Sequence, residues 1–155
     1  MSPGEIVNTT QTKKVVVKFE KCKSLIGKCK TVGASAEEIR TVTLKGELGL
    51  VGTNEAAEAL EPESGTTEAT FECGGLGITV KGGVACAIGP TGKPQTTSKL
   101  TCEGSGGAQK FTSFLGSSTK ATRTVELITE KGGKTTKSDE DATAEITTST
   151  AVEIT

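Results

Sequence analysis

Five cysteines are the residues of this chain that could most readily form a chemical bond: Cys22, Cys29, Cys73, Cys86 and Cys102. The chain has no histidine, which excludes both a Cys–His nucleophile and histidine metal ligands. No Cys-x-x-Cys pair occurs, so the spacing typical of a zinc site is also missing. The sequence therefore favours disulfides, which form in oxidising compartments. The alternative is a set of five reduced thiols that pack as small buried side chains.

Position along the chain predicts two disulfide pairs. Cys22 and Cys29 flank the segment CKSLIGKC and would close a local ring. Cys86 and Cys102 fall on successive expected strands and would cross-link that hairpin. In the chain-entropy model these rings contribute about 2.5 and about 3 kcal/mol. Cys73 is then left as the candidate unpaired thiol.

Carboxylates form the second group of reactive side chains. Acid–base glycoside hydrolysis needs a pair of them, and five glutamates lie close together in the chain: Glu58, Glu61, Glu63, Glu68 and Glu72. Sugar clefts usually carry aromatic platforms, whereas the only aromatic residues here are four phenylalanines. A further acidic run, Ser138-Asp139-Glu140-Asp141, lacks the EF-hand spacing and indicates a solvated loop.

No motif in the chain identifies a catalytic residue, a cofactor-binding residue or a metal ligand. The glycine-rich stretch from Gly104 to Lys110 lacks the Gly-Lys-Ser/Thr order of a phosphate-binding loop. We therefore expect a protein that is not an enzyme and carries no cofactor.

The elements that would position these side chains are short strands. Leu, Ile, Val and Phe sum to 9 + 8 + 11 + 4 = 32 of 155 residues, while Gly and Thr number 20 and 27. Apolar residues mostly alternate with polar ones, as in Lys13–Phe19, and Gly-containing turns separate the segments. The pattern predicts one all-β domain over residues 1–155, a mostly antiparallel sandwich or barrel of about 9–11 short strands stapled by disulfides.

Three segments depart from a clear strand pattern. Ala34–Ile39 and Asn54–Leu60 have helix-like composition, although neither is long enough to be stable alone, and for the second we weigh helix and strand equally. The polar stretch Gly132–Asp141 is expected to be an exposed loop.

Charge limits the expected partners. The net charge is −1, so the chain lacks the basic surplus of a nucleic-acid-binding protein. No apolar run approaches the roughly 18 residues that span a bilayer, and the first residues show no signal peptide.

The net charge alternates by segment, at +4, −6, +6 and −5 over residues 1–50, 51–80, 81–137 and 138–155. These blocks fit neighbouring strands of one sheet, or complementary patches in a homo-oligomer or with a cell-surface partner.

Several segments together resemble a family of uncharacterised, Gly/Thr-rich secreted β domains of actinobacterial type. They are Gly4–Val7, Val15–Phe19 followed by Cys22 and Cys29, Leu44–Gly49, Glu61–Gly65 and Phe71–Gly75, so the resemblance spans residues 4–90. It implies an exported protein with a β architecture. It also implies a cysteine at the position of Asn8, which would be the partner of Cys73. From this we expect Asn8 and Cys73 to lie on neighbouring strands.

Taken together, the sequence predicts a non-catalytic structural or adhesive β domain that is extracellular or at the cell surface. Two alternatives remain open. One is a small-molecule or lipid-binding β-barrel, and the other is a self-assembling subunit of an extracellular filament or virion surface.

Overall fold

The computed structural model describes residues 4–35 and 37–155, and all regular structure within those ranges is β-strand. Seventeen strands form, and every ladder between them is antiparallel. The all-β, mostly antiparallel, disulfide-stapled fold class predicted from the sequence is confirmed. The strand number exceeds the expected 9–11 because long segments break into two strands and because β1, β3, β4 and β6 span only two residues each.

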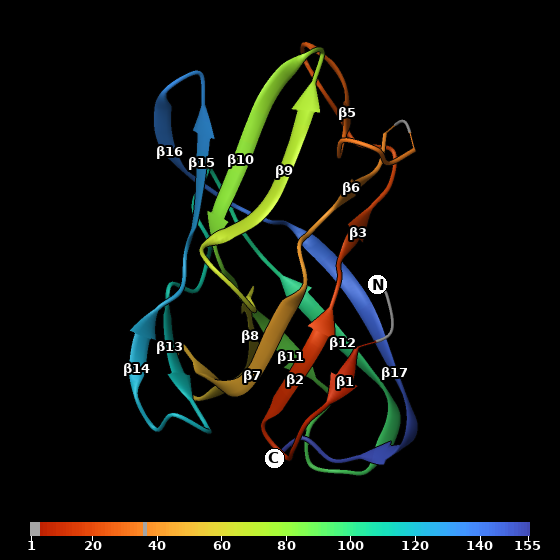
Figure 1. The fold of residues 1–155 in the computed structure, drawn as a ribbon. Helices are drawn as coiled ribbons and strands as arrows, with labels where there is room; N and C mark the ends of the chain where they lie inside the picture. The colour runs from red at the N-terminus through yellow and green to blue at the C-terminus, as the bar shows by residue number, and fades with distance from the viewer. Residues whose placement is uncertain (1–3, 36) are drawn as a thin grey trace.

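The larger sheet, at the bottom of Figure 1, is called the lower sheet here, and its strands curl around a common interior. In spatial order its main path contains β1 (Glu5–Ile6), β2 (Gln11–Val15), β7 (Leu44–Val51), β8 (Glu55–Pro62), β11 (Val84–Gly89), β12 (Gln95–Cys102) and β17 (Ala142–Val152). Off this path, β13 (Ser113–Gly116) pairs with β7 and with β14 (Thr122–Thr124).

The second sheet stands above the first in Figure 1 and is called the upper sheet. In spatial order it contains β16 (Lys134–Ser138), β15 (Leu127–Lys131), β10 (Leu76–Gly82), β9 (Thr67–Cys73), β5 (Gly27–Lys30) and β4 (Lys23–Ser24). A separate two-stranded ladder joins β3 (Lys18–Phe19) to β6 (Ile39–Arg40). The chain passes between the two levels repeatedly, for example from β8 to β9 and from β16 to β17, and we call the region of these crossings the waist.

Two glycines allow one of these crossings, between β10 and β11. Gly82 has φ +102°, a conformation that side chains disfavour, and a Cβ there would lie 2.0 Å from the carbonyl oxygen of Glu126. A Cβ on Gly83 would lie 2.6 Å from the carbonyl oxygen of Leu60. Only glycine lets the chain bend between its neighbours here.

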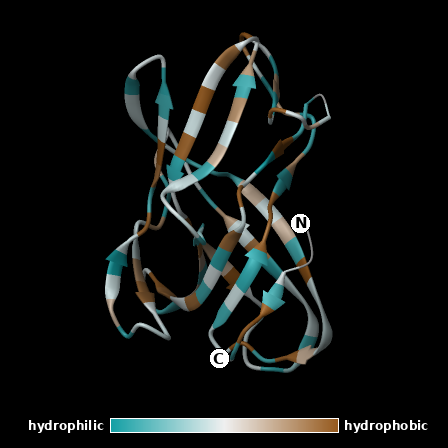
Figure 2. Cartoon of the chain, viewed as in Figure 1, coloured by the Kyte–Doolittle hydropathy of each residue, from teal (hydrophilic) through white to brown (hydrophobic). Residues whose placement is uncertain are grey.

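The apolar core is concentrated in the lower half of the molecule. One cluster surrounds Leu44, Leu60, Val84 and Leu100, and a second surrounds Phe114. The strands of the upper sheet contribute four buried apolar residues: Cys29, Ala69, Cys73 and Leu127. Figure 2 shows hydrophobic and hydrophilic residues alternating along most strands.

The open choice between helix and strand at Asn54–Leu60 is settled as strand. From Glu55 onward the segment lies in β8, paired with β7 on one edge and β11 on the other, and its alanines Ala57 and Ala59 are buried. Two other local expectations are wrong. Position 36 lies outside the described residues, and the rest of Ala34–Ile39 forms no helix. The polar stretch 132–141 contains β16, which forms a hairpin with β15.

We predict that Gly49→Ala will destabilise the fold by about 1–3 kcal/mol, the usual cost of overpacking. A Cβ on Gly49 would lie 2.2 Å from the carbonyl oxygen of Leu115 and 2.5 Å from Cζ of Phe114. Gly77→Ala is the matched control because a Cβ there meets no atom within 4 Å. Urea unfolding of both variants measures the difference, and equal stabilities would contradict this packing.

Candidate functional site

Four of the five cysteines form two disulfides. Cys86 is bonded to Cys102, as expected, and bridges the adjacent strands β11 and β12 inside the main core cluster. Cys29 is bonded to Cys73, across a sequence separation of 44 residues, and Cys22 is a free thiol. The expected Cys22–Cys29 ring and the unpaired Cys73 are therefore wrong. The reason is that β5 pairs with β9, with Cys29 directly opposite Cys73.

Asn8 is not a neighbour of Cys73. It lies in the turn between β1 and β2 in the lower sheet, where its Nδ2 donates to Oε1 of Gln11 at 2.7 Å. Cys73 ends β9 in the upper sheet, beside β10 and β5. The expectation drawn from the resemblance, that these two residues share neighbouring strands, is wrong.

The feature that most resembles a binding site is a cavity of about 230 Å³ between β3 and β17, which we call the seam. Its floor is apolar and includes Leu60, Leu100 and the disulfide-bonded Cys102. One wall is Val17–Phe19, and the other contains Glu140 and Ala142–Glu145. Small size and an apolar floor make the seam suited to an aliphatic group rather than to a sugar or a nucleotide.

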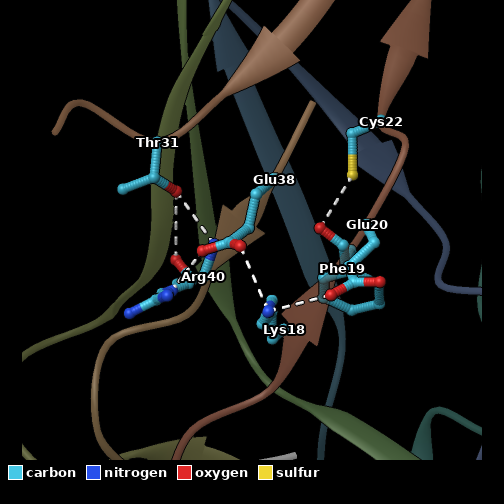
Figure 3. Close-up of polar contacts among 7 residues, drawn as sticks. All are labelled: Lys18, Phe19, Glu20, Cys22, Thr31, Glu38 and Arg40. Carbon is cyan, nitrogen blue, oxygen red and sulfur yellow. Dashed lines mark hydrogen bonds and ion pairs between the residues drawn. The ribbon is translucent and has the colours of Figure 1, made fainter. Parts of the chain in front are cut away.

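Ion pairs hold Lys18, the basic residue of the seam. Its Nζ lies 2.8 Å from Oε1 of Glu20 and 3.2 Å from Oε2 of Glu38. Glu38 also pairs with Arg40, whose backbone N–H donates to Oγ1 of Thr31 at 2.9 Å (Figure 3). Hydrogen bonds to Glu20 and Glu38 raise the pKa of Lys18, so it stays charged. For Glu38, burial alone would raise the pKa, but Arg40 and Lys18 outweigh burial and lower it.

Cys22 lies near this cluster but is not an activated nucleophile. Its Sγ donates to the carbonyl oxygen of Phe19 at 3.3 Å (Figure 3). Burial raises the pKa of the thiol, and the nearby charges of Glu37 and Glu38 raise it further. A protonated, half-buried thiol reacts slowly, because the thiolate is the nucleophilic form.

Two carboxyl groups at the waist lack any cation to compensate them. Glu68, at the start of β9, is 3% exposed, and its Oε2 has no hydrogen-bond partner in the described part of the chain. Burial, with a smaller contribution from the charge of Glu140, raises the pKa of Glu68 to about 8. Burial also raises the pKa of Glu140 to about 7. Both groups therefore hold a proton at mildly acidic pH.

Glu47 shows how a buried carboxylate is stabilised elsewhere in this fold. Its Oε1 accepts from the backbone N–H of Thr119 at 2.9 Å, and its Oε2 accepts from Nη1 of Arg123 at 2.7 Å. Burial would raise the pKa of Glu47, but these two partners outweigh it and lower the pKa. Glu47 thus remains ionised, whereas Glu68 does not.

Glu140 is near enough for its charge to raise the pKa of Glu68, but in the described part of the chain no hydrogen bond joins the two carboxyl groups. The pair combines one glutamate from each acidic run noted in the sequence, Glu58–Glu72 and Ser138–Asp141. Because Oε2 of Glu68 has almost no exposed surface, only protons reach it, and a substrate does not. Sequence reasoning missed the proximity of these two residues because they lie 72 positions apart in the chain.

Among the residues that the structure describes, no other group of side chains forms a stronger candidate. A wider and more open cavity of about 320 Å³ lies beside Lys28, Lys30, Glu37 and Glu72. The lysines of this cavity form ion pairs with its glutamates; Nζ of Lys28 lies 2.6 Å from Oε1 of Glu37. Over residues 4–35 and 37–155, no cluster of three or more His, Cys, Asp or Glu side chains is arranged to hold a metal ion.

Known proteins give no further guidance. Comparison with protein-family models, with curated proteins and with solved structures finds no match to this chain. The resemblance to secreted actinobacterial domains therefore stays a prediction. Of the residues that the structure describes, none belongs to a helix that is long and apolar enough to cross a membrane.

We predict that the stability of the protein falls as the pH rises from about 4.5 to about 8. The unfolded chain releases the Glu68 proton near the ordinary value of 4.5, whereas the folded chain keeps it until about pH 8. The folded state binds more protons over this range, so its stability declines with pH and levels off above it.

Glu68→Gln should reduce this slope, leaving the part that comes from Glu140 and Glu58, whose pKa values burial also raises. It should stabilise the protein at pH 8 by a free energy on the order of 3 kcal/mol. Glu72→Gln is the matched control because it lies on the same strand with its side chain 40% exposed. Urea unfolding at a series of pH values measures both slopes. If Glu68→Gln kept the parental slope, Glu68 would not be the buried protonated group described here.

Proposed function

We propose that this chain is an exported, non-catalytic β domain with a structural or adhesive role. The observation that carries the proposal is the pair of buried disulfides, one in each sheet. Disulfides of this kind indicate an oxidising environment outside the cytosol, and they add covalent support to the apolar core of a chain with few Leu, Ile, Val and Phe residues.

The state of the reactive side chains supports a non-catalytic role. The Cys22 thiol is protonated, Glu38 and Glu47 are neutralised by cations, and Glu68 is sealed from solvent. An acid–base enzyme needs carboxyl groups with altered pKa values that line an accessible cleft. In this fold, Glu140 lines the seam but its partner Glu68 does not.

Disulfide mapping under non-reducing conditions tests this proposal. Native protein purified from an oxidising compartment should yield the linked peptides Cys29–Cys73 and Cys86–Cys102. After denaturation without a reductant, iodoacetamide should modify Cys22 alone. Five modified cysteines in that sample would overturn the export argument, and a Cys22–Cys29 peptide would overturn the fold of the upper sheet.

A second candidate function, a self-assembling subunit, is favoured by the strand edges at the seam. β17 pairs on one edge with β12, and β3 pairs on one edge with β6; within the described ranges, neither has a second strand partner. The apolar floor of the seam lies between these two open edges. An extended segment from another copy would pair with both edges and cover the floor.

For self-assembly, light scattering should show a mass that grows with protein concentration. A constant monomer mass of 15.8 kDa at all concentrations would contradict it. The small-molecule barrel alternative has weaker support, because the core clusters fill the interior of the lower sheet and the seam is smaller than most ligand pockets.

A further inference from the structure

Exposed apolar side chains gather at the end of the upper sheet, on two adjacent hairpin turns. Leu25 and Ile26 occupy the turn between β4 and β5 with relative exposures of 108% and 50%. Leu76 begins β10, just after the turn from β9, and is 36% exposed. Figure 2 shows hydrophobic colour at this end of the molecule, at the top of the view. We call Leu25, Ile26 and Leu76 the apolar tip.

The two turns of the apolar tip are fixed to each other. Beside them, the Cys29–Cys73 disulfide joins β5 to β9. The backbone N–H of Gly74 donates to the carbonyl oxygen of Lys28 at 3.2 Å. A Cβ on Gly74 would lie 2.2 Å from the carbonyl oxygen of Ile26, so the turns are in direct contact. The apolar side chains are therefore displayed on a rigid, protruding support.

Four lysines lie on or next to the β4–β5 hairpin that carries Leu25 and Ile26, and we call them the lysine collar: Lys21, Lys23, Lys28 and Lys30. The register of β4 with β5 sets Lys23 directly opposite Lys28, an arrangement of like charges that destabilises a hairpin. Glu37 pairs with Lys28, and Glu72 lies 3.8 Å from Lys30. In the described part of the chain, Lys21 and Lys23 have no carboxylate within 4.0 Å, so the collar of lysines keeps a net charge of 4 − 2 = +2.

We propose that the apolar tip inserts into the interfacial layer of an anionic lipid bilayer, with Lys21 and Lys23 at the lipid headgroups. Leu25 and Ile26 supply apolar surface that water now covers, and anionic headgroups neutralise the opposed lysines. Binding at a membrane interface strengthens with the apolar area that is buried and with the attraction of basic side chains to anionic lipids, and the apolar tip and its lysines offer both.

The shape of the tip favours a bilayer over a protein partner. Three apolar side chains on a convex end offer far less than the roughly 800 Å² per partner that a stable protein interface buries. A fluid bilayer adapts to a protrusion, whereas a protein partner would need a matching hollow. This proposal goes beyond the structural role above, because it names a surface to which the domain attaches.

Co-sedimentation of the disulfide-intact protein with vesicles tests the proposal. Vesicles of phosphatidylcholine with one third phosphatidylglycerol should bind the protein at low salt, and pure phosphatidylcholine vesicles should bind it much less. The double variant Leu25→Ser/Ile26→Ser should weaken binding by about tenfold or more. Lys21→Gln/Lys23→Gln should weaken it by about fivefold for each charge removed.

Matched controls lie at the other end of the molecule. Ile6 and Val7 form a second adjacent pair of exposed apolar residues, at 55% and 49% exposure. Ile6→Ser/Val7→Ser and Lys93→Gln/Lys99→Gln should bind vesicles like the parent protein. All substituted positions are solvent-exposed except the half-exposed Ile6, Ile26 and Val7, so circular dichroism should show folded variants.

A single tryptophan provides an independent measure of insertion, because the chain has none. Ile26→Trp should shift its fluorescence to the blue with anionic vesicles, whereas Val7→Trp should not shift. Absence of binding to anionic vesicles at low salt would overturn the proposal. The proposal would also be overturned if the Leu25→Ser/Ile26→Ser variant bound anionic vesicles as well as the parent protein, because the protein would then adsorb to the surface without inserting apolar side chains. Neither result would bear on the disulfide mapping that tests the structural role.

Discussion

The bond between Cys29 and Cys73 is the constraint on which the upper half of the molecule depends. The chain concentrates its large apolar residues around the lower sheet, where two clusters fill the curled interior. The upper sheet has few buried apolar residues, and two of those are the bonded cysteines themselves. Without this covalent link, β4 and β5 would be joined to the sheet by the short pairing of β5 with β9, the hydrogen bond from Gly74 to Lys28 and the exposed Lys30–Glu72 ion pair. The same disulfide also holds the two turns of the apolar tip, and the lysines beside them, in place.

Buried carboxyl groups set a second constraint. Glu47 and Glu38 are held by arginine or lysine, and Glu58 accepts a hydrogen bond from Oγ1 of Thr12 at 2.7 Å. Oε2 of Glu68 has no hydrogen-bond partner among the described residues, and burial raises the pKa of Glu68 to about 8, so the fold retains it as a neutral acid. Burial raises the pKa of Glu58 as well. Ionisation of Glu68 would leave an unpaired charge inside the protein.

Local sequence features were sufficient for the all-β class and for the Cys86–Cys102 bond, because that bond spans one hairpin, but they missed strand β16. They were insufficient for Cys29–Cys73, since nothing near either cysteine indicates that β5 lies beside β9. Composition alone left Asn54–Leu60 ambiguous, and burial between β7 and β11 decided it as a strand. The effect of Glu140 on Glu68 was equally hidden, because the two residues lie 72 positions apart and belong to separate acidic runs. Long-range pairing is what the sequence did not reveal.

The most direct test of the central claim is the free energy of unfolding of Cys29→Ala/Cys73→Ala, measured in urea against the parent protein at the same pH. Closing a loop of this length stabilises a protein by about 4 kcal/mol in the chain-entropy model, so the account predicts a loss of that order. A variant as stable as the parent would contradict the claim that this bond supports the upper sheet.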